Sequence, residues 1–127
     1  MSAPFAKYHK SVASFVDDRT ARHMIETILK AMAETVGLQA KDILASKRGQ
    51  PHAFARQSAL FIIGTHTPIK STQIERVSSL DHSSVFYASK LVADIISVYP
   101  TDRALVEGVI TNLFGKVSLN GDKEQRT

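Results

Sequence analysis

The sequence lacks cysteine and tryptophan altogether among its 127 residues. Without cysteine the chain can form no disulfide, has no thiolate nucleophile and cannot bind zinc through sulfur. It has no run of about 18 uncharged apolar residues, which excludes a membrane-spanning helix. The N-terminus through Lys10 also lacks the apolar centre of a secretory signal. These absences predict a chain that stays in the cytoplasm.

Catalytic and metal-binding motifs are missing as well. There is no Gly-x-x-x-x-Gly-Lys-Ser/Thr phosphate loop and no Gly-x-Ser-x-Gly elbow. The histidines show neither an i, i+4 pair nor a His-Glu-x-x-His motif, which disfavours a metal site. His66, near the end of an apolar stretch, is interpreted as a surface or C-terminal capping residue. We therefore expect no enzyme activity, no metal and no cofactor. The five histidines are His9, His23, His52, His66 and His82.

The positive charge is concentrated in the middle of the chain. The net charge is +4, from 16 basic and 12 acidic side chains. Residues 41–80 carry six basic and two acidic residues, whereas the segments before and after them are nearly balanced. A local basic region in an otherwise balanced chain is typical of a protein that binds a polyanion such as nucleic acid.

Apolar residues recur at intervals of three and four rather than two, which predicts an all-α fold of about six helices. The first long helix is expected to begin after an N-cap supplied by the group Asp17, Asp18 and Thr20, which also ends the preceding segment. Gly37 is suited to end this helix. The other expected helices are a short one over Lys41–Ser46, one from Pro51 to Gly64, a brief one capped by Ser71 or Thr72, a long one from Asp81 to Pro100, and a final one from Thr101 to Gly115.

The long helix after Asp81 is predicted to be amphipathic. Its inward side chains would be Val85, Ala88, Val92, Ile95 and Tyr99, and its outward ones His82, Ser83, Tyr87, Lys90 and Asp94.

The predicted organisation has three parts. Residues 1–20 form an N-terminal helical extension, residues 21–115 a single helical domain, and residues 116–127 a disordered tail. The extension carries an apolar stripe of Phe5, Tyr8, Val12 and Phe15. This stripe either packs back on the domain or serves as a dimer contact or docking surface, and the final helix could serve the same purpose.

A short helix, a tight turn and a longer helix follow one another between Ser71 and Pro100, the arrangement of a helix-turn-helix unit. In such a unit the first turn of the second helix enters the major groove of DNA. Asp81, His82, Ser83 and Ser84 occupy that turn, and carboxylate, imidazole and hydroxyl groups all bond base edges. Spacing alone equally allows that Asp81 and Ser84 only cap the helix.

The segment beginning at Asp81 resembles a signature of the C-terminal DNA-binding domain of DnaA, the bacterial replication initiator. It reads Asp-His-Ser-Ser-Val where that family has Asp-His-Thr-Thr-Val, and Ala88 and Lys90 follow. The rest of the resemblance lies upstream, in the same order and at similar spacing as that domain's short helix, basic loop and next helix. These upstream pieces are Lys41-Asp42-Ile43-Leu44, Lys47-Arg48 and Arg56-Gln57 with Ala59, so that the resemblance covers roughly residues 21–98.

The resemblance implies a Trp-repressor-like helix-turn-helix bundle that binds double-stranded DNA. By position, Arg48 resembles the family's minor-groove arginine, and a guanidinium suits the narrow groove of A·T-rich DNA. The alternative for Arg48 is a solvated loop charge. The family comparison implies base contacts from Asp81, His82, Ser83, Ser84 and Arg48, and phosphate contacts from Lys47, Arg56, Gln57 and Lys90.

Three departures from the family pattern bear on this interpretation. Ser78, Ser79 and Leu80 replace paired glycines and a basic residue before the signature, and the segment is one residue shorter. Ser83 and Ser84 lack the methyl groups with which threonine contacts a thymine methyl. The chain is also too short for the initiator's ATPase module. We therefore expect DNA binding at a sequence other than the initiator's own.

The sequence therefore predicts a sequence-specific DNA-binding protein of the cytoplasm and nucleoid that regulates transcription, with activation of phage-like or prophage-derived genes as the favoured version. The alternatives are a replication-control protein that competes for DnaA-type sites and a helical protein-interaction module that no longer reads DNA. RNA polymerase or another regulator is considered as a partner. A homodimer would place two units on two half-sites.

Overall fold

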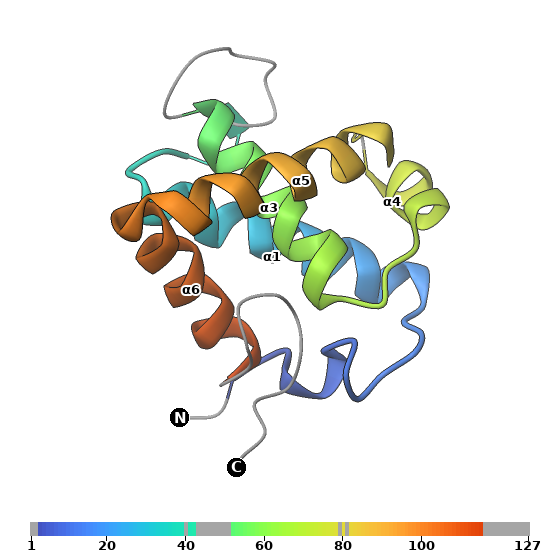
Figure 1. Cartoon of the computed structure of the whole chain (residues 1–127). Coiled ribbons are helices and arrows are strands. Elements are labelled where there is room, and N and C mark those ends of the chain that lie inside the picture. Colours follow the sequence, from blue (N-terminus) through green and yellow to red (C-terminus); the bar gives the residue numbers. More distant parts are fainter. Residues whose placement is uncertain (1–2, 40, 43–51, 79, 81, 116–127) are drawn as a thin grey trace.

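The structure, a computed structural model, describes residues 3–39, 41–42, 52–78, 80 and 82–115, with side chains for all of these except residues 82–84. In these ranges it has five α-helices of seven or more residues, one 3-10 turn and no β-strand, which confirms the all-α prediction. The elements are the turn Ala6–Tyr8, α1 (Asp18–Thr35), α3 (His52–His66), α4 (Ser71–Val77), α5 (His82–Val98) and α6 (Pro100–Phe114) (Figure 1).

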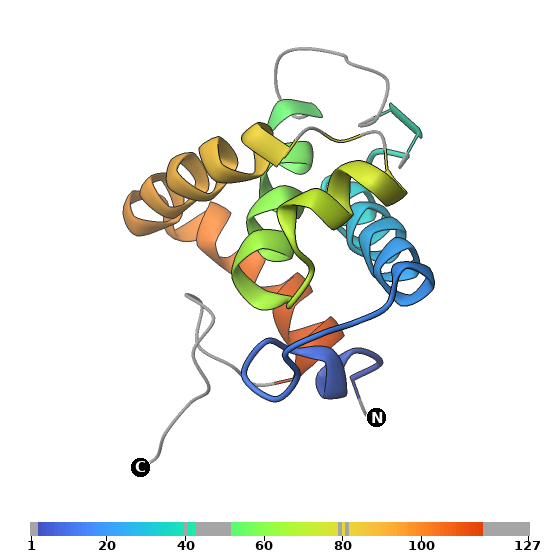
Figure 2. The ribbon, with the colours of Figure 1, turned by 90° about the vertical axis from the view of Figure 1, so that its right-hand side faces the viewer.

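Helix α3 is the centre of the fold. Nine of its 15 residues are buried, and a helix that is apolar around most of its circumference has to be surrounded by other elements. Helices α1 and α5 both pack against it, as Figures 1 and 2 show. The residues predicted to lie in the core, Ala55, Ala59, Leu60, Ile62 and Ile63, are all buried.

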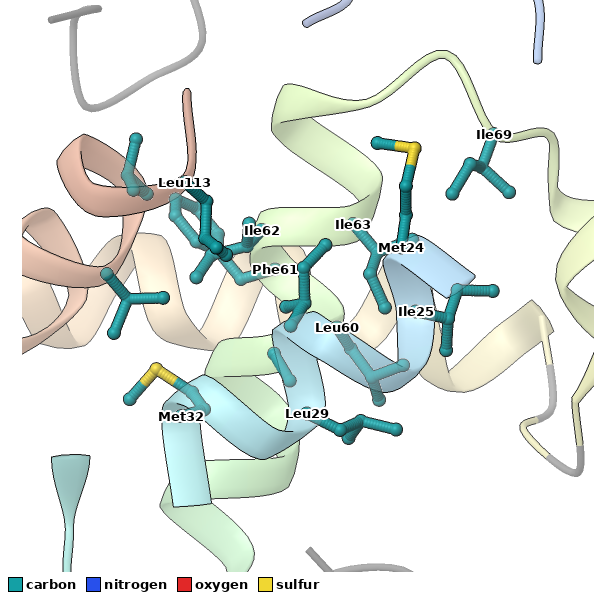
Figure 3. Close-up of a cluster of buried hydrophobic side chains, with 14 of the residues drawn as sticks. Met24, Ile25, Leu29, Met32, Leu60, Phe61, Ile62, Ile63, Ile69 and Leu113 are labelled. Atoms are coloured by element: carbon teal, nitrogen blue, oxygen red, sulfur yellow. The ribbon is translucent and has the colours of Figure 1, made fainter. Parts of the chain in front are cut away.

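The core between α1 and α3 is almost entirely aliphatic (Figure 3). Met24, Ile25, Leu29 and Met32 lie on one face of α1 because they recur at helical spacing, and that face packs against the run from Leu60 to Ile63. All of these side chains are buried, so truncating any one to alanine would cost about 2 to 5 kcal/mol of stability.

The ends of α1 follow the sequence signals. Asp17 is the N-cap, and its Oδ1 accepts a hydrogen bond of 2.9 Å from the backbone N–H of Thr20. Hydrogen bonds from the side chain and then the backbone of Thr20 lower the pKa of Asp17. Gly37, just beyond the helix, has φ of 80°, a conformation in which glycine avoids the strain of a Cβ. Of the expected short helix after it, Lys41 and Asp42 are helical, and residues 43–46 lie outside the described ranges.

Two predicted helix boundaries are wrong. Helix α3 does not end at Gly64 but continues to His66, where the Thr67 hydroxyl donates a 2.6 Å hydrogen bond to the carbonyl of Ile63 and closes the last turn. Helix α6 is not capped by Thr101. It begins with Pro100 at its first position, because a proline needs no backbone partner there and its fixed φ suits a helix.

The inward face of α5 also differs from the prediction near its end. Val85, Ala88 and Val92 are buried as predicted, but Ile96 rather than Tyr99 completes the buried face. Tyr99 lies beyond the end of the helix at Val98 and is exposed. Helical spacing no longer determines which way its side chain points.

The expected N-terminal helix carrying Phe5 to Phe15 is absent. Residues 3–16 form a single 3-10 turn and local turns instead of a helix, and two of their backbone groups bond distant segments: the Phe5 N–H donates to the carbonyl of Leu113 at 2.7 Å, and the Lys10 N–H to the carbonyl of His66 at 3.0 Å. Phe5 is buried and Tyr8 packs against the core, whereas Val12 and Phe15 are exposed. The interpretation that the stripe packs back on the domain is thus confirmed for its first half only.

The N-terminal segment, residues 3–16, also overturns the interpretation of His66 as a surface or C-terminal capping residue. The side chain is buried, not at the surface, because the N-terminal segment covers the end of α3.

No helix in the described part of the chain is long and apolar enough to span a bilayer.

Candidate nucleic-acid interface

Helices α4 and α5 form the predicted helix-turn-helix unit. Helix α4 has seven residues and α5 has 17, and the segment 78–81 joins them. A short supporting helix followed by a longer one is the geometry in which the second helix presents its first turn to a DNA groove. One side of α4 is buried, and it consists of Gln73, Ile74 and Val77.

Helix α4 is attached to the start of α1 by a polar network that sequence reasoning missed. Arg76 donates two hydrogen bonds of 2.8 Å to the carboxylate of Asp18, one to each oxygen. Gln73 donates from its Nε2 to Asp18 Oδ1 at 3.0 Å and to the carbonyl of Val16 at 2.8 Å. These three side chains fix the orientation of α4, and no sequence pattern links positions 55 and 58 residues apart.

The charges in this network are coupled. The hydrogen bonds from Arg76, and then that from Gln73, lower the pKa of Asp18 to about 2. The same carboxylate raises the pKa of Arg76. The guanidinium of Arg76 is therefore already neutralised by Asp18, and we assign it to the structure of the unit rather than to a ligand.

The turn between α4 and α5 is closed by a serine. The Ser78 hydroxyl donates to the carbonyl of Ile74 at 2.6 Å and accepts from the N–H of Leu80 at 3.2 Å. Leu80 is half-buried and packs against the core. Ser78 and Leu80, two of the residues that replace the family's glycines and basic residue, thus provide a hydrogen-bonded turn and an additional apolar contact.

The rotation of α5 about its own axis is set by a close approach to α3. A Cβ added to Gly64 of α3 would stand 2.9 Å from Cγ1 of Val85 and 3.1 Å from Oγ of Ser89. The missing side chain lets the two helices touch at this point. With Val85 and Ala88 held inward, the opposite face of α5 carries Lys90 and other exposed side chains.

The predicted contact residues fall into two groups. The backbone of His82, Ser83 and Ser84 forms the first turn of α5, as expected, while their side chains lie outside what the structure describes. Asp81, Arg48 and Lys47 also lie outside the described residues. The helix N-cap predicted for Asp81 and the groove contact predicted for Arg48 therefore remain predictions.

The second group is described in full. Arg56 and Gln57 are half-buried near the start of α3, and Lys90 is exposed on α5. The starts of α3 and α5 both lie on the upper side of the molecule in Figures 1 and 2. The structure thus places the start of α3, the helix that carries Arg56 and Gln57, on the side of the molecule on which α5 begins.

No metal centre is formed by the described side chains, among which no three histidine or acidic residues lie close enough to hold an ion. The two most buried histidines, His9 and His66, bond each other instead.

The all-helical architecture of the described residues and the α4–α5 pair define the class as a small helical protein built around a helix-turn-helix unit. Comparison with known families gives the particular family. The model described as "Bacterial dnaA protein helix-turn-helix" matches residues 25–92, more than half of the chain. The chain belongs to this family, which confirms the resemblance inferred from the sequence.

Similar full-length proteins are chromosomal replication initiator proteins DnaA. That of Thermodesulfovibrio yellowstonii is 29% identical over 117 residues, which is 91% of this chain and 26% of the relative. That of Pelobacter propionicus is 28% identical over 101 residues, 79% of this chain and 22% of the relative. The chain thus spans about a quarter of the length of these relatives. No solved structure matches the chain.

Proposed function

We propose that this protein binds double-stranded DNA in a sequence-specific manner, without catalysis, and regulates transcription. The observation that carries the proposal is the family match over residues 25–92, which spans α4, the turn and the first two thirds of α5. A domain at residues 21–115 would act as the binding unit. In a unit of this class the second helix reads bases and flanking cations hold the phosphates.

Each side chain in the proposed interface has a separate role. Arg56 and Gln57 would bond the phosphate backbone near the start of α3, and Lys90 would reach a phosphate from the exposed face of α5. Arg48 would enter the minor groove, with Lys47 beside it on a phosphate. The base contacts would come from Asp81, His82, Ser83 and Ser84 in the first turn of α5.

The favoured regulatory role is activation of phage-like or prophage-derived genes, in contact with RNA polymerase or another regulator. Two protein copies on two half-sites would bind more tightly than one. A second candidate, control of replication by competition for DnaA-type sites, is favoured by the relatives, which are replication initiators. Both roles place the protein in the cytoplasm on the nucleoid.

Titration with duplex DNA at several salt concentrations tests the proposal. Binding through phosphates should weaken steeply from low to moderate salt. The logarithm of the binding constant should fall with the logarithm of the salt concentration, with a slope of about 0.9 for each phosphate neutralised. A helical module that binds only proteins through apolar contacts would show no DNA affinity and little salt response.

Single substitutions test the division of roles. His82→Ala and Ser83→Ala should each cost about 1 to 3 kcal/mol on the specific site and little on random duplex. Arg56→Ala should weaken both alike. Equal losses on both duplexes from His82→Ala and Arg56→Ala would contradict the assignment of the first turn of α5 to base reading.

A further inference from the structure

Tyr87 is an aromatic side chain exposed on α5, one turn beyond the positions proposed to read bases. It is 63% exposed. The burial of Val85 and Ala88 on either side, and the contact of Val85 with Gly64, hold the rotation of the helix. Tyr87 therefore cannot turn inward unless α5 separates from α3.

Tyr87 lies on the same helix face as two proposed DNA contacts. It follows residue 83 by four positions and precedes Lys90 by three, the spacings that put helical residues in line. At 1.5 Å per residue it stands about 6 Å along the helix from residue 83. The major groove is about 8.5 Å deep, so the second turn of a helix that enters by its first turn is still within the groove or at its edge.

Tyr87 can supply an apolar contact to DNA that the serines of this sequence cannot make. Ser83 and Ser84 stand where the family signature has threonine, and they keep the hydroxyl but lack the methyl group. Thymine is distinguished in the major groove by its C5-methyl group, which is read by apolar contact. A tyrosine ring offers a large apolar surface with few rotatable bonds, so little conformational entropy is lost on contact.

We propose that Tyr87 is a specificity-determining residue that recognises a thymine by packing its ring against the C5-methyl group. This inference rests on the proposed DNA binding, and deepens it by assigning one base of the site to one side chain. The hydroxyl of Tyr87 has no part in the recognition.

Deoxyuridine substitution tests this directly, because it removes the thymine methyl and nothing else. A binding site is first selected from random duplexes with the wild-type protein. Each thymine is then replaced in turn by deoxyuridine. One replacement should weaken wild-type binding about fourfold, the factor expected for one buried methyl group. Tyr87→Ala should bind the thymine site more weakly and no longer distinguish it from the deoxyuridine site.

Two variants serve as matched controls. Tyr87→Phe should keep the thymine preference, because it removes only the hydroxyl. Tyr99→Ala removes another exposed tyrosine, 58% exposed beyond the far end of α5, and should also keep it. All three variants should melt at the wild-type temperature, because each replaced side chain is exposed.

Three results would overturn the inference alone. If Tyr87→Phe loses as much as Tyr87→Ala, the hydroxyl makes the contact. If Phe86→Ala, which removes the 73% exposed neighbour, abolishes the thymine preference while Tyr87→Ala keeps it, the wrong aromatic residue was assigned. If no deoxyuridine replacement weakens wild-type binding to its selected site, the inference fails while the proposed function stands. Failure of the wild-type protein to bind any duplex would remove both.

Discussion

The imidazole of His9 is hydrogen-bonded to that of His66, with 2.9 Å between Nε2 of the first and Nδ1 of the second, and both rings are buried. The backbone N–H of Ser11 donates to His9 Nδ1 at 3.1 Å, so that nitrogen is an acceptor and the proton of a neutral ring sits on Nε2. His9 therefore donates and His66 accepts. The pair joins residues 57 positions apart and fastens the N-terminal segment to the end of α3.

The first prediction concerns the strength of this histidine pair. His9→Leu and His66→Leu should each destabilise the protein by about 1 to 3 kcal/mol, because each leaves a buried ring nitrogen without its bonding partner. The double variant should lose less than the sum of the two, since the unpaired group is then gone as well. Urea unfolding of the four proteins measures this coupling.

His23→Leu is the control for that series. His23 is exposed and makes only an edge-on ring contact with Phe5 among the contacts described for it, so its replacement should change stability by no more than about 0.5 kcal/mol. Strictly additive losses from His9→Leu and His66→Leu would show that the two rings do not stabilise each other.

The second prediction is a loss of stability in acid. The pKa of Asp18 is lowered from 3.8 to about 2, chiefly by hydrogen bonds from Arg76. Because the folded-state value lies below the unfolded one, the stabilisation is fully present above about pH 4 and is lost as the pH falls toward 2. Asp18→Asn should therefore flatten the stability profile in this window, measured by thermal unfolding at a series of pH values.

Asp94→Asn provides the comparison for Asp18. Asp94 is an exposed carboxylate on α5 and lies outside the network with Arg76. Its replacement should leave the acid limb of the profile as steep as in the wild type. A wild-type slope in Asp18→Asn would mean that other carboxylates cause the acid sensitivity.

The third prediction uses two glycines inside helices. Gly64→Ala should destabilise the protein by about 1 to 3 kcal/mol, because its Cβ would stand 2.9 Å from Val85 and force α3 and α5 apart. Gly108→Ala on α6 should instead stabilise it by up to about 1 kcal/mol, since no atom apart from the neighbouring residues and backbone of the same helix lies within 4 Å of the new Cβ, and alanine favours the helix.

The two glycine variants also separate stability from DNA binding. Gly64→Ala shifts the helix that carries the proposed base contacts, so its affinity for a selected site should fall even at temperatures where it is fully folded. Gly108→Ala should bind as the wild type does. Chemical unfolding and duplex titration on the same samples give both quantities, and equal binding by both variants would contradict the positioning role of the contact between Gly64 and Val85.

The fourth prediction concerns the basic segment before α3. Arg48→Ala should lose the preference for A·T pairs beside the major-groove site, because a guanidinium favours the narrow, electronegative minor groove of such sequences. Site selection with both proteins measures this preference. An unchanged preference for A·T pairs beside the site would show that Arg48 does not enter the minor groove and is a solvated charge.

Periodicity predicted most of the helical core, because apolar residues that recur every three or four positions lie on the same face of a helix. Met24, Ile28 and Met32 on α1, and Val106 and Ile110 on α6, are buried as their spacing indicates. The start of α1 and the glycine after it were also recognisable, since capping depends on local hydrogen bonds alone.

The failures occurred where contacts between distant segments override local pattern. Phe5 and Phe15 share an apolar stripe by spacing, yet Phe5 is buried and Phe15 exposed, because the backbone of the N-terminal segment bonds to Leu113 and His66. The burial of His66 and the network around Asp18 have the same origin. Of the interface, the sequence indicated the helices and the outward position of Lys90, but no pattern could predict how α4 is attached to α1.

The bond between the Phe5 N–H and the Leu113 carbonyl has a practical consequence for experiments. It brings the two ends of the described chain together at the lower edge of the molecule in Figures 1 and 2, while α5 begins at the upper side. A fluorophore, affinity handle or surface tether attached at either end of the described chain would therefore stand on the side of the molecule opposite to the start of α5.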